Sequence, residues 1–258
     1  MFGREEHNYL QSHLVEDYIV NAYVTKVFVW MFFGLLITAA TTGGIIWAMG
    51  GTEYALLEFF ERSQFVFFAL FIGQLILVYS ISAKVQKLNP VTAKVLYIIY
   101  AMSNGLTVGM IVTMYAMYVV GIATVAMAFG ITAVSFGIMA IYGLVTKKDL
   151  TSFGSLLFAG LIGIIIASVA NWFIGSSMLD FLICVAGLFI FLGLVAVDTY
   201  KIKNYFARVA VESHNPDGTV DMNQAVLASN LAIYGALMLY LDFVNMLLFI
   251  LRLLGRRR

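Results

Sequence analysis

Apolar residues run in long blocks along most of this chain, and polar residues gather in the short stretches between the blocks. A helix that crosses a bilayer needs about 20 apolar residues, each adding a rise of 1.5 Å. The blocks therefore predict membrane-spanning helices, and we place seven along the chain. Their expected ranges are 27–49, 63–83, 95–114, 122–145, 152–172, 181–200 and 228–253.

Two of these boundaries rest on short polar stretches. The charge-free sequence between Lys94 and Lys147 is too long for one helix, and polar aromatic residues at 115–121 predict a turn inside it. The longest polar connection is expected at 201–223, where the Asn-Pro-Asp-Gly sequence at 215–218 is typical of a turn. Asp217 and Asp221 allow a calcium-loop interpretation there, but the regular ligand spacing of such loops is missing.

Composition supports the same class of protein. Hydrophobic residues make up 62% of the chain, charged residues 11%, and the mean hydropathy is +0.95, beyond what a soluble core can bury. The net charge of +1 gives no basic field that would attract nucleic acid. The single cysteine, Cys184, excludes an internal disulfide and is expected in the core. We expect an all-α integral membrane protein with one seven-helix domain over residues 1–258.

The charges between the spans predict the orientation of the chain. The polar segment 1–26 lacks the features of a cleavable signal, so the first span is expected to direct insertion. Lys and Arg gather after the second, fourth and sixth spans, which places those connections and the amino terminus in the cytoplasm. Seven spans then put the arginines at 256–258 outside the cell, whereas basic residues normally gather on the cytoplasmic side. The conflict disappears if the last segment does not cross fully.

Glycine is frequent inside the expected spans. Small residues let helix backbones approach closely in lipid, where packing drives helix association. We therefore expect a packing role for the spaced pair Gly105 and Gly109 in the third span. The same role is expected for four further glycines: Gly130, Gly137, Gly160 and Gly163.

Several kinds of catalysis lack their residues. All three histidines, His7, His13 and His214, lie outside the spans, which excludes haem ligation by two histidines within the membrane. The chain has no zinc-protease motif, phosphate-binding loop or dinucleotide fingerprint. Membrane aspartyl proteases carry Gly-x-Gly-Asp at one aspartate, whereas residues 195–198 here read Val-Ala-Val-Asp. We expect a protein that is not an enzyme and carries no cofactor.

Two acidic residues, Asp198 and Asp242, lie inside the sixth and seventh spans. Charged residues within membrane spans are rare and mark functional sites by default. The two spans are adjacent and antiparallel, so the carboxyl groups are expected to meet and share a proton, because both cannot ionise cheaply side by side. The alternative is that Lys201, three residues after Asp198, pairs with it on one helix face.

Uncharged polar residues in the spans suggest a route past this pair. Asn245 follows Asp242 by three residues, and Gln74 and Asn104 lie in the second and third spans. Singly, such residues are more often interhelical hydrogen-bonding groups. Together they form a candidate polar path for a cation.

Four segments of the chain resemble the Bax-inhibitor family, the transmembrane Bax-inhibitor-motif proteins, in a bacterial form. The likeness extends from the first span to the end, and the last two segments carry it most specifically. The segments are residues 128–136, 146–151, 197–202, and 239–245 together with 251–255.

The resemblance implies a seven-helix fold with the last helix central. It also implies a pH-sensitive calcium leak whose two aspartates correspond to Asp198 and Asp242, which would hold calcium in passage. A basic residue at the cytoplasmic end of the second span engages the first aspartate in the family, and the nearest candidates here are Lys84 and Lys87. Gln74 stands where some members carry an acid. Some bacterial relatives bind a membrane-bound AAA protease, so a regulatory role without transport is the alternative function.

Overall fold

A computed structural model of the protein describes residues 2–48, 58, 62, 64–84, 87–212 and 222–256, with side chains described from residue 18 and not at residues 64, 210–212 and 222–225. The described residues are helical apart from short connections, and they contain no strand. The helices are α1 (Phe2–Ala48), α3 (Gln64–Lys84), α4 (Pro90–Asn104), η1 (Gly105–Gly109), α5 (Met110–Tyr115), η2 (Ala116–Val120), α6 (Ile122–Val145), α7 (Thr151–Ile174), α8 (Ser177–Glu212) and α9 (Met222–Gly255).

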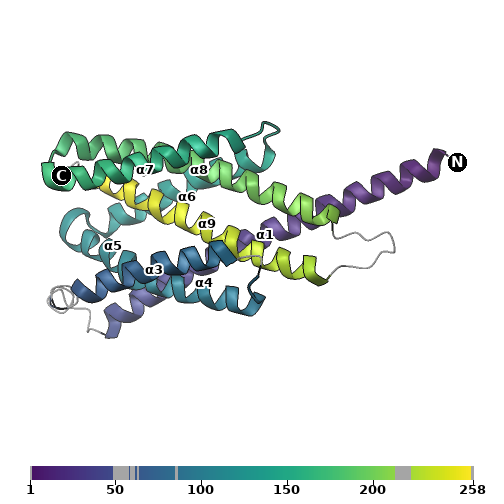
Figure 1. The fold of residues 1–258 in the computed structure, drawn as a ribbon. Helices are drawn as coiled ribbons and strands as arrows, with labels where there is room; N and C mark the ends of the chain where they lie inside the picture. The colour runs from purple at the N-terminus through teal and green to yellow at the C-terminus, as the bar shows by residue number, and fades with distance from the viewer. Residues whose placement is uncertain are drawn as a thin grey trace.

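Seven helical segments are long and apolar enough to cross a membrane, as the sequence predicts. The first lies in the carboxyl-terminal part of α1, whose amino-terminal part projects beyond the bundle as further helix (Figure 1). The third comprises α4, η1, α5 and η2 in succession, and each of the other five corresponds to one helix. The chain is therefore a multi-pass helical membrane protein.

The turn expected at 115–121 was placed too early. The backbone stays helical through η2 to Val120, and the chain reverses only at Gly121, whose φ of 81° suits a residue without a side chain. Both η1 and η2 are π-helical, a form that widens the helix by one residue per turn. Polar aromatic residues are tolerated in a helix near the membrane surface, so their presence did not mark the turn.

The sixth helix also extends beyond its expected end at residue 200. It continues to Glu212, so the first half of the polar connection expected at 201–223 is helix. A fall in hydropathy marks the exit from hydrocarbon, whereas a helix ends where its backbone is interrupted. The predicted turn at 215–218, with Asp217 and Asp221, lies outside the described residues.

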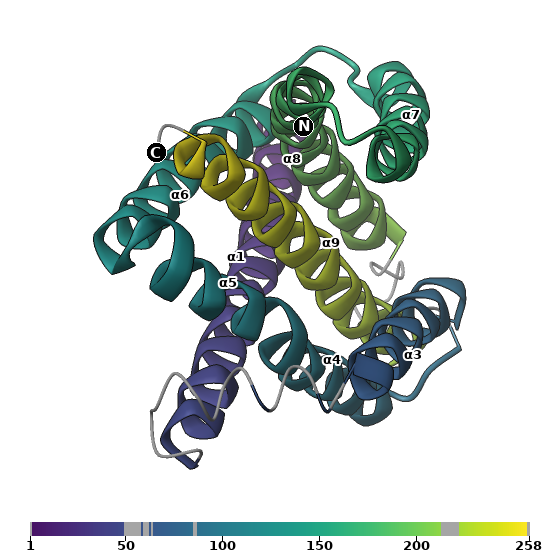
Figure 2. The ribbon, with the colours of Figure 1, turned by 90° about the vertical axis from the view of Figure 1, so that its left-hand side faces the viewer.

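Helix α9 lies at the centre of the bundle, as the resemblance implies. Figure 2 shows it between α1, α3, α4, α6 and α8, and it is the most buried of the seven spans. Its pairing with α8 is the most extensive in the described structure. Helix α7 packs chiefly on the outer side of α8, so α9 is not ringed evenly by all six neighbours.

Helices α1 and α4 run parallel and approach closely through hydroxyl groups. The Thr38 hydroxyl donates to the Ala101 carbonyl at 3.0 Å, and one turn later Thr42 donates to the Gly105 carbonyl at 2.9 Å. A Cβ at Gly105 would lie 2.7 Å from the Thr38 carbonyl oxygen. The packing role predicted for Gly105 and Gly109 is therefore confirmed.

The packing prediction holds for Gly160 but is wrong for the other three glycines. A Cβ at Gly160 would contact Ile190 at 2.8 Å, whereas a Cβ at Gly130, Gly137 or Gly163 would meet nothing within 4 Å. Spacing along one helix cannot show whether a small residue faces a neighbouring helix or an open side.

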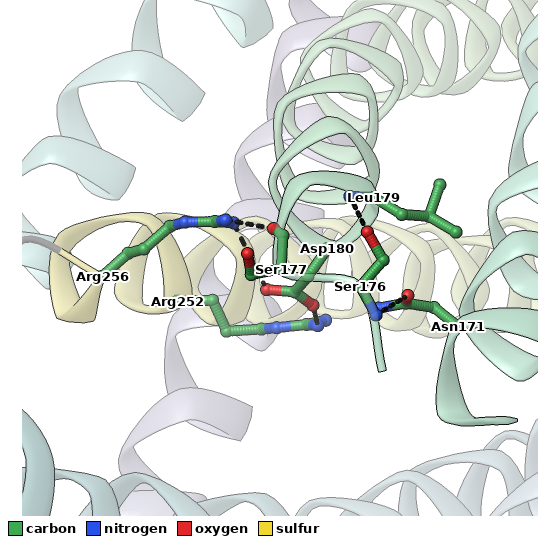
Figure 3. A network of polar contacts seen from close by, with 7 residues as sticks. All are labelled: Asn171, Ser176, Ser177, Leu179, Asp180, Arg252 and Arg256. Atoms are coloured by element: carbon green, nitrogen blue, oxygen red, sulfur yellow. Dashed lines mark hydrogen bonds and ion pairs between the residues drawn. The ribbon is translucent and has the colours of Figure 1, made fainter. Parts of the chain in front are cut away.

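The far end of α9 is held to the start of α8 by charge (Figure 3). Arg252 forms an ion pair with Asp180, and the Arg256 guanidinium lies 3.8 Å from the second oxygen of the same carboxylate. Arg256 also donates to the Ser177 carbonyl and lies over the Phe181 ring. The last helix is long enough to cross fully, and an acidic partner at its end partly balances the arginines that conflicted with the charge rule.

Gly143 sets the distance between α6 and α8, and its replacement by alanine is expected to destabilise the fold. A Cβ there would lie 2.4 Å from the Ala196 carbonyl oxygen and 3.0 Å from the Thr199 side chain. Backbone cannot yield as a flexible side chain can, so overpacking should lower the unfolding free energy by about 1–3 kcal/mol. The measurement is the unfolding midpoint in detergent.

Gly130→Ala on the same helix is the matched control for this variant. The Cβ of this alanine would meet no atom within 4 Å. The unfolding free energy should therefore only rise, by up to about 1 kcal/mol, through the better helix propensity of alanine. Equal midpoints for the two variants would contradict the close approach of α6 and α8.

Candidate functional site

Asp198 lies on α8 about three-fifths of the way along the helix, where apolar sequence gives way to the polar end. Its side chain is buried among helices, with 7% of the residue exposed. Neighbouring residues on α8 fix its surroundings: Val195 and Thr199 are fully buried, and the Thr199 hydroxyl donates to the Val195 carbonyl at 2.6 Å. The helix thus presents one carboxyl group to the bundle interior with little freedom to move.

The partner of Asp198 is Lys201, one turn further along the same helix. The ammonium nitrogen lies 3.3 Å from Oδ1 of Asp198, and the Lys201 side chain is about one-third exposed. A buried carboxylate needs a partner to remain charged, and a lysine can supply it while keeping its ammonium group near water. The sequence left two partners open for Asp198; the structure shows the contact with Lys201, and proton sharing with Asp242 stays a prediction.

Asp242 lies deeper, on the central helix α9. The residue is 5% exposed, and its Oδ2 atom is buried without a hydrogen-bond partner in the described structure. Its electrostatic neighbours are Asp198 and, with the opposite sign, Lys201. Asp198 of α8 and Asp242 of α9 are therefore both buried, and Asp198 pairs with the ammonium group of Lys201.

Two separate anions would be costly in these buried surroundings. Burying an ionised carboxylate without full hydrogen bonding is expensive, and a second carboxylate nearby adds repulsion. One lysine can balance one of the two charges but not both. A proton held on Asp242 would leave Asp198 as the anion that Lys201 accompanies.

A polar cavity of about 300 Å³ lies beside Lys201 at the end of the bundle. Lys201 both lines this cavity and contacts Asp198, so it separates the cavity from the buried carboxyl groups. Polar groups around such a volume are suited to hold water. The lining residues are Asp149, Thr151, Tyr200, Lys201, Asn204, Tyr205 and Arg208.

Asp149 is the one carboxylate in the lining of this cavity, and it does not titrate near neutral pH. Hydrogen bonds from the hydroxyl and then the backbone N–H of Thr151 lower the pKa of Asp149 below its ordinary value. Because the pKa of Asp149 is lowered in the folded protein, its carboxylate stabilises the fold fully at pH values above the ordinary pKa. This stabilisation is lost as the pH falls through the folded-state pKa. Asp149 therefore stays ionised near neutral pH.

Gln74 and Asn104 form part of a second buried cluster. Gln74 of α3 donates to the Thr107 hydroxyl at 2.8 Å, and Asn104 of α4 donates to the Tyr100 hydroxyl at 2.8 Å. The Gln74 bond ties α3 to η1, in keeping with the role such residues have most often in membranes, whereas the Asn104 bond lies within α4. Asn245, half-buried one turn after Asp242, is the residue of the expected polar path that lies nearest the aspartates in sequence.

Lys84 and Lys87 are exposed where α3 ends. The turn that carries them is fixed to α9, because the Asn230 amide donates to the Leu88 carbonyl at 2.6 Å. They therefore lie at the end of the bundle where α9 begins, the same end as the polar tail of α8. The described contact to Asp198 comes from Lys201 instead.

The cavity residues Asn204, Tyr205 and Arg208 were missed because the sequence was interpreted as a loop after residue 200. A signal was present: with Lys201 they follow spacings of three and four, which place them along one helix face. The absence of glycine or proline before Pro216 was consistent with a continuing helix.

No group of three or more His, Cys, Asp or Glu that could enclose a metal ion occurs in the part of the chain with described side chains. Two carboxylates and nearby amide oxygens can contact a hard cation in passage. Tight binding would need six to eight oxygen ligands. The chemistry of the site is suited to brief contact with a cation and to proton transfer.

Comparison with known proteins agrees with this architecture. The sequence profile of the family described as "Inhibitor of apoptosis-promoting Bax1" matches residues 20–258. The inner membrane protein YbhL of Escherichia coli K12 is 35% identical over 239 residues, covering 93% of each chain. An uncharacterized protein of Borreliella burgdorferi is 37% identical over 245 residues, covering 94% of this chain and 95% of its own.

A third relative, an uncharacterized membrane protein of Streptococcus pyogenes, is 35% identical over 201 residues and covers 78% of this chain. The family profile, which matches residues 20–258, includes both helices that carry the aspartates, α8 and α9. The seven spans, the central last helix and these matches together identify the chain as a member of the Bax inhibitor family of membrane proteins.

Proposed function

We propose that this protein is a pH-gated leak for calcium in the cytoplasmic membrane of a bacterium, and that it catalyses no reaction. The observation that carries the proposal is the pair of buried carboxyl groups on α8 and α9, of which Asp198 forms an ion pair with Lys201. The inner-membrane relative from Escherichia coli supports the location. Calcium is the substrate of this transport, and protons are its regulator.

Proton loss from the carboxyl pair is the opening step. In the closed state the pair holds one proton, so its charge is matched by the single ammonium group of Lys201. Alkaline conditions remove this proton and leave two carboxylates in a low-dielectric interior, where they repel. The repulsion separates α8 from α9 at the site, and the freed carboxylates then accept a hard cation. The leak is therefore expected to rise with pH.

We propose Lys201 as the gate residue, ahead of Lys84 and Lys87, because it is the lysine in contact with Asp198. It touches Asp198 and lines the polar cavity, so any cation that reaches the carboxyl groups from this side must pass its ammonium group. A positive charge at this position repels calcium until the carboxylate charge increases. Gly154 at the start of α7 leaves room for the Lys201 side chain. A Cβ at Gly154 would lie 3.3 Å from the Lys201 ammonium nitrogen.

Purified protein in calcium-free liposomes tests the proposal. A fluorescent indicator inside the vesicles should report calcium influx that increases from acid to alkaline pH, above that of empty liposomes. No influx above empty liposomes at any pH would overturn the transport function. That result would instead favour the regulatory alternative, in which the protein restrains a membrane-bound AAA protease.

Replacing Lys201 by glutamine is expected to move the pH of half-maximal leak toward alkaline values. Without the ammonium group, the ionised carboxyl pair loses its one opposite charge, so a higher pH is needed to remove the proton. A shift of one pH unit corresponds to about 1.4 kcal/mol of lost interaction. The measurement is the liposome influx rate across a series of pH values.

Lys203→Gln is the matched control for the lysine variant. It removes an equal charge two residues away, but its ammonium group donates to the Leu144 carbonyl of α6 at 2.7 Å and not to a carboxylate. An equal alkaline shift in both variants would show a general surface-charge effect and contradict the assigned role of Lys201.

The proposal places the amino terminus in the cytoplasm, together with the end of α8 and the start of α9. Lys and Arg gather at this end of the helices, and cytoplasmic connections carry such an excess. A reporter domain fused after Lys87 is expected inside the cell. Activity of a periplasm-specific reporter at that position would reverse the orientation and put the cavity outside.

A further inference from the structure

A second cavity of about 870 Å³ lies between α1 and α6, far larger than the one beside Lys201. Helix α9 forms its floor through Phe243, Val244 and Leu247, and η1 and α5 close one side. We call it the α1–α6 groove. Its volume is within the roughly 300–1,000 Å³ that ligand pockets in proteins span.

The walls of the α1–α6 groove offer almost nothing to water. Its only residues with polar side chains are Thr38, Thr42 and Thr113. Each of these hydroxyls already donates to a backbone carbonyl of a helix. A buried water needs two to four polar partners, so an apolar cavity of this kind does not hold ordered water.

The mouth of the groove opens toward the hydrocarbon of the bilayer. Its rim is formed by large apolar side chains of two spans, Phe32 and Leu36 on α1 and Phe129 and Ile141 on α6, which are 47–62% exposed. Side chains of this type at mid-span face lipid. The interior residues Phe136, Phe243 and Val244 are in contrast buried.

We propose that the α1–α6 groove binds an acyl chain of a membrane lipid. An empty groove would forfeit the dispersion contacts of its lining, and lipid chains are the apolar molecules present at its mouth. A helix of a second protein copy is too large, because a spanning helix about 10 Å wide and 30 Å long occupies roughly 2,400 Å³. A single flexible chain fits a narrow apolar volume that a helix cannot enter.

The bound chain would touch the central helix one residue from the carboxyl site. The Phe243 ring packs edge-on against Phe129 and Phe136, with ring centroids 5.2 Å and 5.6 Å apart, so a chain in contact with Phe129 or Phe136 is linked to the central helix by packing. Phe243 directly follows Asp242 in the sequence. The lipid chain thus adds packing at the floor of the groove, where α9 contributes Phe243, Val244 and Leu247.

Photochemical labelling tests this proposal without any measure of transport. The full-length protein is reconstituted in vesicles of phosphatidylethanolamine and phosphatidylglycerol that carry a diazirine on one acyl chain. After illumination, peptide mass spectrometry locates the attached lipid. Label on Phe243 or Val244 is expected, because a chain in the groove is the one that reaches these buried side chains of the central helix.

Gly137→Leu is the variant that fills the groove. Gly137 lines it, and a Cβ there meets nothing within 4 Å, so leucine extends into open volume without strain. Label on α9 should fall about tenfold, the effect of 1.4 kcal/mol on a binding constant. Ala133→Phe, also in the lining, gives a second filled groove.

The matched control is Gly163→Leu on α7, where a Cβ also meets nothing but no groove is present. It should label as the wild type does. Label confined to the outward-facing Val134 and Ile138, or label on α9 that both groove-filling variants leave unchanged, would overturn the proposal. A loss of calcium leak with normal labelling would concern the carboxyl site alone.

Discussion

Replacing Asp198 or Asp242 by asparagine is expected to abolish the pH dependence of the calcium leak. Each variant should keep a low influx rate from acid to alkaline pH, with less than about twofold variation. In the wild type, one titrating proton permits the calcium influx rate to change by up to about tenfold per pH unit. Asparagine has nearly the shape of a protonated aspartic acid, so it holds the site in its closed, uncharged form.

The size of the expected effect follows from charge repulsion. Two unit charges 4 Å apart interact with about 4 kcal/mol at an effective dielectric constant of about 20. Each 1.4 kcal/mol changes an equilibrium tenfold, so this repulsion can shift two helix arrangements by nearly a thousandfold. Removing either charge removes the whole term, and the double variant should therefore add little to either single one.

Asp149→Asn is the control for both aspartate variants. Asp149 is a carboxylate at the cavity that Lys201 lines, but the hydrogen bonds from Thr151 keep its pKa below the ordinary value. Its replacement should leave the pH of half-maximal leak unchanged. A full pH response in Asp198→Asn or Asp242→Asn, with each variant folded and monodisperse, would refute gating by the carboxyl pair.

The second large effect concerns the central helix. Leu237→Ala is expected to lower the unfolding free energy by about 2–4 kcal/mol, because the Leu237 residue is 1% exposed and its loss leaves a cavity among helices. In a bilayer, exposed and buried leucines both lie in apolar surroundings, so little of this loss comes from transfer out of water. The cost is one of packing alone.

Leu156→Ala on α7 is the control for Leu237→Ala. Leu156 is 68% exposed, and lipid fills the space that its side chain vacates. Its replacement should change the unfolding midpoint in bicelles or detergent very little. Similar midpoints for the two variants would show that α9 is not the core of the bundle.

The number and approximate places of the spans could be predicted from the sequence, because hydropathy is a local property that adds along the chain. The ends of the helices could not. The turn expected at 115–121 falls at Gly121, and the helix expected to end at residue 200 continues to Glu212. Backbone interruption and exit from the membrane are different events, and only the first ends a helix.

The candidate site divides in the same way. A charge inside an apolar block is visible in one dimension, so Asp198 and Asp242 could be singled out as residues. Their neighbours could not: the contact that the structure shows to Asp198 is made by Lys201, and Gln74 bonds to Thr107 in another cluster. Which polar groups meet depends on the rotation of each helix, which the local pattern leaves open.

The sequence by itself determined that the chain is a bundle of apolar spans with two acidic residues inside it, since each of these facts follows from composition within a window of about 20 residues. Only the tertiary structure decided that Asp180 at the start of α8 meets Arg252 near the end of α9 and that α1 and α6 part to leave a groove. Both depend on contacts between residues far apart in the chain. Such contacts are set by how side chains pack between helices, and this packing cannot be predicted from local hydropathy.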